Sequence, residues 1–215
     1  MMRLLAVCAG TARPIRAKSG RTGHFKTPQN GAQISTMGVE GDSIVDTAHH
    51  GGPEQALYIL GEKDRLWWEQ TLARPLPAGF MGENLLIDGL DSADLCLGDI
   101  LDIGPIRIQI TAPRIPCVTF QTVLARPDAL ALFFASNHPG AYARVLRPGP
   151  VEAFDPVALH PYDGHRLPIP AHLTAFRAGL SDLDYLQRCL TVPAHKKLHD
   201  IARDRLAKAQ GRPIS

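Results

Sequence analysis

Residues 99–111 limit the possible folds of this chain more than any other segment. From Ile106 to Ile110 every second residue is isoleucine, and the residues between them are polar. This alternation with a period of two is typical of a strand that has one buried face. Gly104-Pro105 supplies a turn after an apolar run at 100–103, so we predict two strands joined by a tight connection.

Short strands with frequent turns are predicted over most of the chain. Glycine and proline account for 19 and 18 of the 215 residues, an excess that favours turns over a helical bundle. The thirty residues after Gly10 show little periodicity and are predicted as a long loop. We predict a mainly β (α+β) fold, a β-barrel or strongly bent sheet with a few peripheral helices. The other predicted strands are 3–8, 55–60, 84–90, 142–146 and 151–159, and the predicted helices are 62–73 and 127–136.

The character of the sequence changes after Pro170. Ser181-Asp182-Leu183-Asp184 is similar to a capping box, and apolar residues then recur at helical spacing. We predict two or three small helices over 171–210 and interpret the segment 167–170 as a linker. The predicted organisation is a barrel domain at 1–165 and a small helical domain at 171–215.

Composition excludes several classes of protein. The formal net charge is +2, and the chain has no aromatic-rich basic strand on which nucleic-acid bases could stack. No apolar run approaches the ~20 residues of a membrane-spanning helix. The cysteines lie far apart without a C-x-x-C pair, which excludes a zinc ribbon and a dense disulfide framework. We therefore predict a cytoplasmic protein, without nucleic-acid or membrane partners, that has free thiols at Cys8, Cys96, Cys117 and Cys189.

The segment Pro113-Arg114-Ile115-Pro116-Cys117 is the strongest local signal for chemistry. It follows directly after the predicted strand, and its two prolines restrict the backbone. Arg114 lies three residues from the sulfur, and a nearby cation favours the thiolate, the form that attacks substrates or binds metal. A buried structural cysteine is the equally weighted alternative.

Three turns carry further polar residues. Paired glycines allow close backbone approach to an anion, His50 can donate a proton near neutral pH, and Asn84 offers both a donor and an acceptor. The alternative is that these segments are only tight turns with surface side chains. The segments are Gly38-Val39-Glu40-Gly41-Asp42, His49-His50-Gly51-Gly52-Pro53 and Gly82-Glu83-Asn84.

His195 and His199 stand four residues apart on a predicted helix, as in a helical zinc pair. The metalloprotease pattern needs glutamate directly after the first histidine, and Lys196 occupies that position. We interpret this pair as structural.

The order and spacing of these motifs resemble the MOSC domain, the family named for the C-terminal part of molybdenum-cofactor sulfurases. The resemblance covers roughly residues 3–160 and is greatest to the stand-alone bacterial branch that includes the YiiM proteins. That branch usually ends in a three-helix domain. Besides the segments above, the resemblance includes Lys18-Ser19-Gly20, Phe25-Lys26, Leu97-Gly98-Asp99, Gly140-x-Tyr142-x-Arg144-Val145 and Pro148-Gly149.

The resemblance implies a β-barrel that binds the molybdenum cofactor (molybdopterin), and pyridoxal phosphate binding is a further property of the family. It also implies reduction of small N-hydroxylated substrates, such as the detoxification of 6-hydroxylaminopurine, with electrons from a flavoprotein donor. A monomer or homodimer is expected.

The resemblance assigns roles to individual residues. Cys117 is the expected metal ligand and catalytic residue, and His50 is the expected catalytic proton donor. The expected cofactor-binding residues are Lys18, Lys26, Asp42, His50, Gly51, Gly52, Asn84 and Arg114. Two alternatives remain open, a sulfur carrier or cofactor-binding module with a persulfide on Cys117, and a metal-free Cys–His hydrolase.

Overall fold

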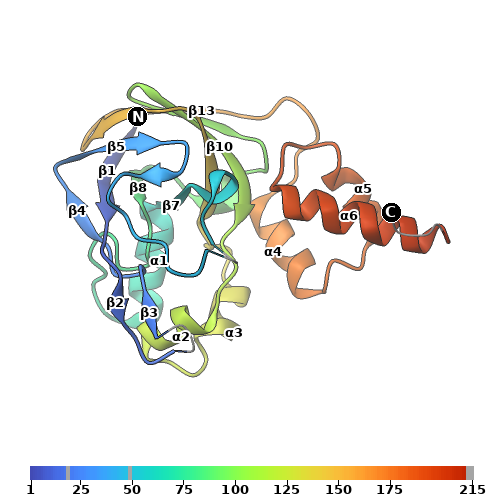
Figure 1. The fold of residues 1–215 in the computed structure, drawn as a ribbon, viewed down its shortest axis with the longest axis horizontal. Helices are drawn as coiled ribbons and strands as arrows, with labels where there is room; N and C mark the ends of the chain where they lie inside the picture. Colours follow the sequence, from blue (N-terminus) through green and yellow to red (C-terminus); the bar gives the residue numbers. More distant parts are fainter. Residues whose placement is uncertain (18–19, 48–49, 212–215) are drawn as a thin grey trace.

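Seven strands form a closed barrel because the first strand pairs with the last. The structure, a computed structural model, describes residues 1–17, 20–47 and 50–211. Around the barrel the order is β13-β9-β10-β11-β7-β8-β1, and β1 then pairs with β13 (Figure 1). Of these pairings only β7 with β8 is parallel. The strands are β1 (Met2–Ala9), β7 (Leu57–Gly61), β8 (Leu85–Asp88), β9 (Ile100–Ile103), β10 (Ile106–Pro113), β11 (Ala141–Arg147) and β13 (Pro156–His160). The predicted mainly β fold is confirmed.

The hairpin predicted from the isoleucine alternation is present as β9 and β10. Ile106, Ile108 and Ile110 are fully buried, and Gly104 at the turn has a φ of 50°. Ile106 pairs with Ile103 across the hairpin. Strand β10 continues beyond the alternating segment to Pro113, which places the Pro-Arg-Ile-Pro-Cys segment at the end of a rigid strand.

The prediction of one long loop after Gly10 was wrong. This region forms five short strands, and β4 extends the barrel sheet by pairing with β1. These strands have only two to five residues and many of their residues are exposed, so no apolar alternation reveals them, and the partners of β4 and β12 (Gly149–Glu152) lie far away in the sequence. The strands are β2 (Arg13–Pro14), β3 (Arg21–Thr22), β4 (Thr27–Gln29), β5 (Gly31–Ser35) and β6 (Gly38–Val39).

The single strand predicted at 151–159 is divided into two. Residues 149–152 form β12 (Gly149–Glu152), which pairs with β5 in a separate small sheet, whereas β13 closes the barrel. Phe154, at the break, has a φ of 72°. The chain therefore changes sheets within a segment whose apolar pattern is continuous.

Three helices pack on one another against the barrel. They are α1 (Glu62–Leu72), α2 (Val118–Leu124) and α3 (Ala129–Ala135). The aromatic rings of Trp68, Phe120 and Phe133 are fully buried at their centre, with ring centroids 5.2–5.8 Å apart. The helices predicted at 62–73 and 127–136 are confirmed as α1 and α3, while α2 was not predicted.

The C-terminal region is helical, as predicted, up to the last described residues. It contains α4 (Ile169–Arg177), α5 (Leu183–Cys189) and α6 (Lys196–Ala209), which lie beside the barrel (Figure 1). Asp182 caps α5 by accepting a hydrogen bond from the Tyr185 backbone N–H, 3.1 Å away. Buried residues of these helices belong to the same hydrophobic cluster as the barrel interior. The division at 165–171 into two domains stays a prediction.

The segment interpreted as a linker is fixed to the barrel domain instead. The Leu97 N–H donates to the carbonyl of Leu167, and the Ile169 N–H donates to the carbonyl of Leu95, at 2.9 and 2.8 Å. Leu167 and Ile169 are buried. Their alternation with two prolines places apolar side chains inward, so this segment is part of the core. Among the described residues, no helix has the length and apolar character needed to cross a bilayer.

A buried carboxylate joins three parts of the fold that are distant in sequence. Asp64, in the first turn of α1, is fully buried and accepts hydrogen bonds from the Gly61 N–H at 2.8 Å and the Ser92 hydroxyl at 2.8 Å. His138 Nδ1 lies 3.0 Å from the same carboxylate, and its hydrogen bond to Asp64 raises the pKa of His138. Since the oxygens of Asp64 are occupied by protein donors, we interpret this network as structural.

Asp64→Asn is expected to lower the free energy of unfolding by roughly 1–3 kcal/mol, because an amide leaves buried donors without a good acceptor. Urea unfolding measures this, and Asp94→Asn, an exposed carboxylate in the neighbouring turn, serves as the control.

The raised pKa of His138 adds a second measurement, the pH dependence of the free energy of unfolding. Stability from the charged imidazole is complete below the pKa of the unfolded state and is lost as pH rises through the folded pKa. Asp64→Asn should lack this pH-dependent loss of stability. Equal pH profiles of the free energy of unfolding in the wild type and the variant would contradict the assignment of Asp64 as the partner of His138.

Candidate active site

Cys117 differs from the other cysteines in its exposure and its surroundings. It directly precedes α2, with an extended backbone, and is partly exposed, whereas Cys8, Cys96 and Cys189 are buried. All four thiols are free. Of the two alternatives that the sequence left open for Cys117, the fully buried structural cysteine does not describe this residue.

The surroundings of Cys117 favour the thiolate. Burial by itself raises the pKa of the Cys117 thiol, but three groups together lower it to about 6. They are a hydrogen bond from the His50 side chain, a hydrogen bond from the Phe120 backbone N–H, and the positive charge of Arg114. Because the thiolate is the reactive and metal-binding form, Cys117 can act as a nucleophile or as a metal ligand at neutral pH.

The guanidinium of Arg114, whose positive charge acts on the Cys117 thiol, is buried. Its guanidinium carbon lies 4.8 Å from the ring centroid of Tyr58 and 4.9 Å from that of Phe120. One guanidinium nitrogen donates to the carbonyl of Met81, and the other lies 3.4 Å from Nδ1 of His24. The described contacts of Arg114 are thus within the protein, and its predicted contact with a cofactor phosphate stays a prediction.

His24 is a site residue that the sequence reasoning missed. Burial and then the charge of Arg114 lower the pKa of His24 to about 3, so the imidazole is neutral at physiological pH. Its Nε2 lies 3.0 Å from the Phe80 carbonyl, which only a protonated Nε2 can satisfy. Nδ1 is therefore the acceptor that faces Arg114. Nothing in the local sequence distinguishes His24 from the other polar residues between Arg13 and Lys26.

Three of the predicted cofactor-binding residues meet in a buried network. Lys26 and Asp42 form an ion pair with side chains 7% and 6% exposed. Asn84 donates to Asp42 Oδ2 at 2.8 Å and accepts from the Tyr58 N–H at 3.1 Å, while the Gly10 N–H donates to Asp42 Oδ1 at 3.0 Å. These contacts join β1, β7 and the loops before β4 and after β6. Cofactor binding by these residues stays a prediction, and Lys18 lies outside the described residues.

The turn at residues 50–52 requires its glycines. Gly51 and Gly52 have φ angles of 75° and 74°, which residues with a side chain rarely adopt. A Cβ on Gly51 would also lie 2.7 Å from a methyl group of Ile44. The turn directs His50 toward Cys117 and toward a cavity.

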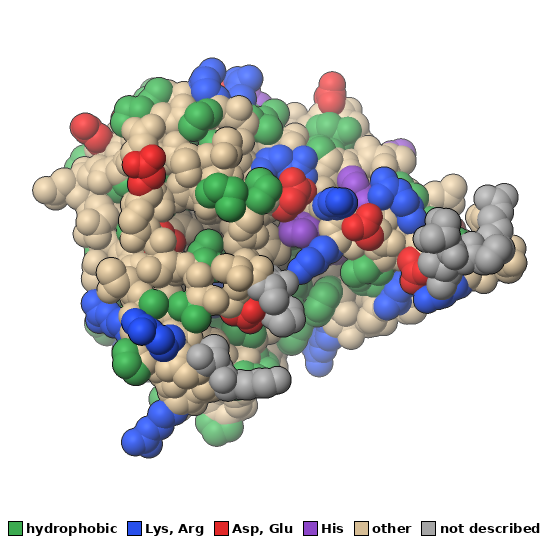
Figure 2. All heavy atoms as spheres, viewed as in Figure 1, with side chains coloured by type: hydrophobic (Ala, Val, Ile, Leu, Met, Phe, Trp, Pro, Cys, Tyr) green, Lys and Arg blue, Asp and Glu red, His purple; other side chains and the backbone are tan. Residues whose placement is uncertain are grey.

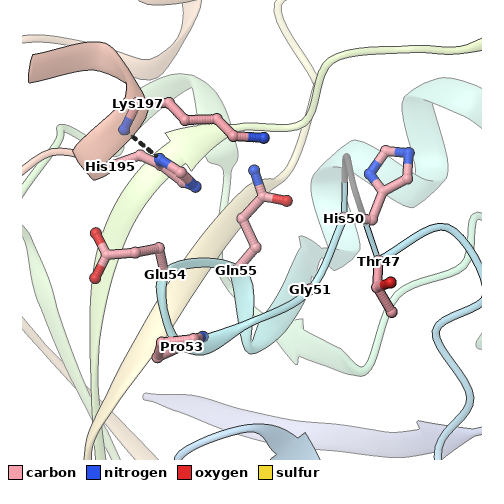
Figure 3. A pocket seen from close by; sticks show the side chains of 8 residues that line it. All are labelled: Thr47, His50, Gly51, Pro53, Glu54, Gln55, His195 and Lys197. Atoms are coloured by element: carbon pink, nitrogen blue, oxygen red, sulfur yellow. Dashed lines mark hydrogen bonds between the residues drawn. The ribbon is translucent and has the colours of Figure 1, made fainter. Parts of the chain in front are cut away.

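Two neighbouring cavities adjoin His50, with volumes of about 200 and 180 Å³. Gln55, His195 and Lys197 line both of them together with His50 (Figure 3). Figure 2 shows histidine, basic and acidic side chains gathered where the barrel meets the C-terminal helices. Most of the remaining wall of the second cavity is apolar and comes from both parts of the chain, namely Pro113, Ile115, Tyr142, Phe176, Leu198 and Ile201.

Arg144 fastens the start of α6 to the barrel. Its guanidinium donates to Glu54 Oε2 at 2.8 Å and to the carbonyls of Ala194 and Pro193 at 2.8 and 3.2 Å. The His195 N–H donates to the Thr111 carbonyl of β10 at 2.9 Å. The C-terminal helices are therefore held as one wall of the cavities.

The interpretation of His195 and His199 as structural agrees with their contacts. His195 Nδ1 accepts from the Lys197 N–H at 2.9 Å, and His199 Nε2 lies 2.9 Å from the Val192 carbonyl. Among the described residues, neither histidine belongs to a group of three potential metal ligands. His195 nevertheless lines the cavities, which the sequence reasoning did not predict.

Comparison with known proteins identifies the class to which this barrel and its cysteine loop belong. Residues 46–158, more than half of the chain, match the MOSC domain family, and the chain belongs to that family. The match contains His50, Asn84, Arg114 and Cys117 and ends before α4.

Within this family the chain is similar to proteins of the YiiM-like branch. It is 32% identical to the uncharacterized protein YflK of Bacillus subtilis over 135 residues, and 32% identical to protein YiiM of Escherichia coli over 129 residues. These matches span 62% and 59% of this chain, and 61% and 58% of the relatives. A protein of Gibberella moniliformis named reductase is 27% identical over 81% of this chain, which corresponds to 32% of that protein.

A solved structure supports the fold. The crystal structure of YiiM from Geobacillus stearothermophilus aligns with a TM-score of 0.78 at 24% identity, covering 96% of this chain and 100% of that one. The likeness covers the barrel and the C-terminal helices together.

Alkylation of Cys117 by iodoacetamide should increase with pH around a midpoint of about 6 and level off above it, since the thiolate is the nucleophile. In His50→Gln the midpoint should rise by about one pH unit or more, because a hydrogen bond to a charged group contributes roughly 1.5–3 kcal/mol. Peptide mass spectrometry after timed alkylation measures both. Cys8 and Cys189, whose pKa values burial raises to about 12 and about 11, are internal controls. A midpoint near 9 in both proteins would contradict this electrostatic account.

Arg144→Gln should loosen the attachment of α6, because it removes the guanidinium that donates to Glu54 and to the carbonyls of Pro193 and Ala194. Amide hydrogen exchange in residues 193–209 should accelerate by about 10-fold, equivalent to about 1.4 kcal/mol. The matched control is Arg203→Gln, which removes an exposed arginine of α6 whose partner is Asp200 in the same helix. Unchanged exchange in Arg144→Gln would show that the helices are held without Arg144, by apolar packing and the remaining hydrogen bonds of His195 and Lys196.

Proposed function

We propose that this protein binds the molybdenum cofactor and reduces small N-hydroxylated compounds, with Cys117 as the metal ligand. The observation that carries the proposal is the Cys117 thiol, which is hydrogen-bonded to His50, a residue that lines a cavity of about 180 Å³. Membership of the MOSC domain family supports the cofactor, and the name of the Gibberella relative supports a reductase.

The chemistry of the site fits a thiolate-bound metal. Thiolate is a soft donor suited to transition metals, and Cys117 reaches that form at neutral pH. Cys117 is partly exposed, whereas Arg114 behind it is buried, so the sulfur is the accessible member of the pair. In the proposal Gly51 and Gly52 lie against the cofactor, and Lys18, Lys26, Asp42, Asn84 and Arg114 are its further contacts. Pyridoxal phosphate binding stays a prediction.

Reduction of an N–OH group breaks the N–O bond and consumes two electrons and two protons to release an amine and water. The bound cofactor supplies redox chemistry at the metal, and a flavoprotein is the proposed source of electrons. This chain supplies the thiolate, the enclosed charge of Arg114 that stabilises it, and the His50 side chain as the proton donor. The proposed substrates include hydroxylamino derivatives of purine bases, whose detoxification would be the biological role.

The proposal also includes a cellular location, a class of substrate and an oligomeric state. Free cysteines suit a reducing compartment, so we propose a cytoplasmic location. The proposed substrate is a small molecule, and the protein is proposed to act as a monomer or homodimer.

Cys117→Ser should lower metal content and reductase activity by roughly 100-fold or more. Loss of an outer-shell partner alone typically costs about 10–100-fold, and a serine hydroxyl is a harder donor that stays protonated at neutral pH. The protein is produced in a host that makes the cofactor, and molybdenum per chain and hydroxylamine reduction are measured. Cys189→Ser, a buried thiol in α5, is the control and should retain metal and activity. Sulfane sulfur on Cys117 without metal would favour the sulfur carrier, and full activity of Cys117→Ser would end the proposal.

A further inference from the structure

The side chain of Gln55 has an unused hydrogen-bonding atom in the wall of the cavities. Its Oε1 atom is buried and has no partner among the described residues. Buried polar atoms are normally paired, and leaving one unpaired costs about 1–3 kcal/mol. Gln55 lines both cavities, and rotation of its carboxamide about χ3 would present this enclosed oxygen to a ligand there.

Hydrogen bonds hold the backbone at Gln55 in place, so its side chain starts from a defined position and can discriminate between ligands. Its N–H donates to the Gly52 carbonyl at 3.1 Å, and the preceding carbonyl, of Glu54, accepts from the Thr111 hydroxyl at 2.7 Å. The Glu54 side chain is in turn paired with Arg144. Figure 3 shows the Gln55 carboxamide between His50 on one side and the side chains of His195 and Lys197 on the other.

The groups around Gln55 define the chemistry of a ligand. A carboxamide presents an acceptor and a donor side by side, and it pairs with a partner that presents the same two groups in the opposite order. Amides and amidines, including heteroaromatic rings with an exocyclic amine, have such an edge. Tyr142, Phe176 and Pro113 provide flat apolar surface in the second cavity, which favours a planar ring.

His195 adds a neutral donor to this wall. Burial lowers the pKa of His195, so the imidazole is uncharged at neutral pH. Because Nδ1 accepts from the Lys197 N–H, Nε2 is the protonated nitrogen. The site therefore combines one bidentate carboxamide with a further N–H donor, a pattern suited to a neutral ring that carries several acceptors.

We propose that Gln55 is a specificity-determining residue that pairs with the amide or amidine edge of a planar substrate, in a subsite formed jointly by the barrel and the C-terminal helices. The inference rests on the proposed function in one respect: an edge held by Gln55 places the attached N–O group near His50, and hence near Cys117. The pairing itself requires neither metal nor catalysis, so it can be tested separately.

The test compares benzamide with acetophenone, which keeps the ring and carbonyl but has a methyl group in place of the amine. Dissociation constants are measured by ligand-observed NMR titration of the full-length chain. The wild type should bind benzamide about 10-fold more tightly, since a bidentate pair contributes roughly 1–3 kcal/mol of discrimination. Gln55→Met removes both polar atoms at similar length and should bind the two compounds equally. Gln187→Met, an exposed glutamine in α5, should keep the wild-type preference.

A second variant protects the test against a folding defect. Gln55→Glu keeps the shape of the side chain and an acceptor for the benzamide N–H, which acetophenone lacks, so it should still prefer benzamide, whereas Gln55→Met should not. Equal affinities in the wild type or in Gln55→Glu, no binding of either compound, or a preference that persists in Gln55→Met would overturn the inference. None of these results depends on molybdenum content, whereas the Cys117→Ser experiment does not depend on Gln55, so failure of one proposal is distinguishable from failure of the other.

Discussion

The buried cation of Arg114 is the interaction on which the rest of the site depends. A charge withdrawn from water is costly, and arginine does not give up its proton, so the surroundings must compensate the charge. Two aromatic rings, the Met81 carbonyl and neutral His24 do so in part. Negative charge comes from the Cys117 thiolate, while burial raises the pKa of the nearby Glu83 to about 7 even though Arg114 opposes this. Arg114 thus links the aromatic cluster of the helices to the acidity of the reactive thiol.

The cavity beside the thiol exists because two parts of the chain meet there. The barrel provides His50, Gln55 and the loop at 113–117, while α4 and α6 provide the opposite wall. The family match ends at residue 158, yet Arg144 and Glu54 of the matched region form hydrogen bonds with residues 193, 194 and 196. The C-terminal helices are therefore part of the site in this protein.

Regular spacing of apolar residues along the chain predicted the strands and helices that have one buried face. The isoleucine alternation identified β9 and β10, and helical spacing identified α1 and the C-terminal helices. Strands β2 to β6 were missed because they are short and largely exposed, and the change of sheet at Phe154 leaves no mark in the apolar pattern. In the site, Cys117 and His50 followed from motifs. His24 and Gln55 did not, because their importance arises only from contacts with residues far away in the sequence. The family resemblance assigned Lys26, Asp42 and Asn84 to one site, but no motif shows that the three side chains pair with one another in a buried network.

Closure of the barrel by its first and last strands has a consequence for synthesis on the ribosome. Met2 and Arg3 of β1 pair with β13, so this end of one edge of β1 has no partner until some 150 further residues have been translated, whereas Val7 to Ala9 on the same edge pair with β4. At translation rates of about 5–20 residues per second, this interval lasts roughly 8–30 s. During that time an apolar strand with an open edge is available for pairing with other nascent chains. Slowing translation before β13 would therefore lengthen the time for which this part of β1 is exposed to aggregation.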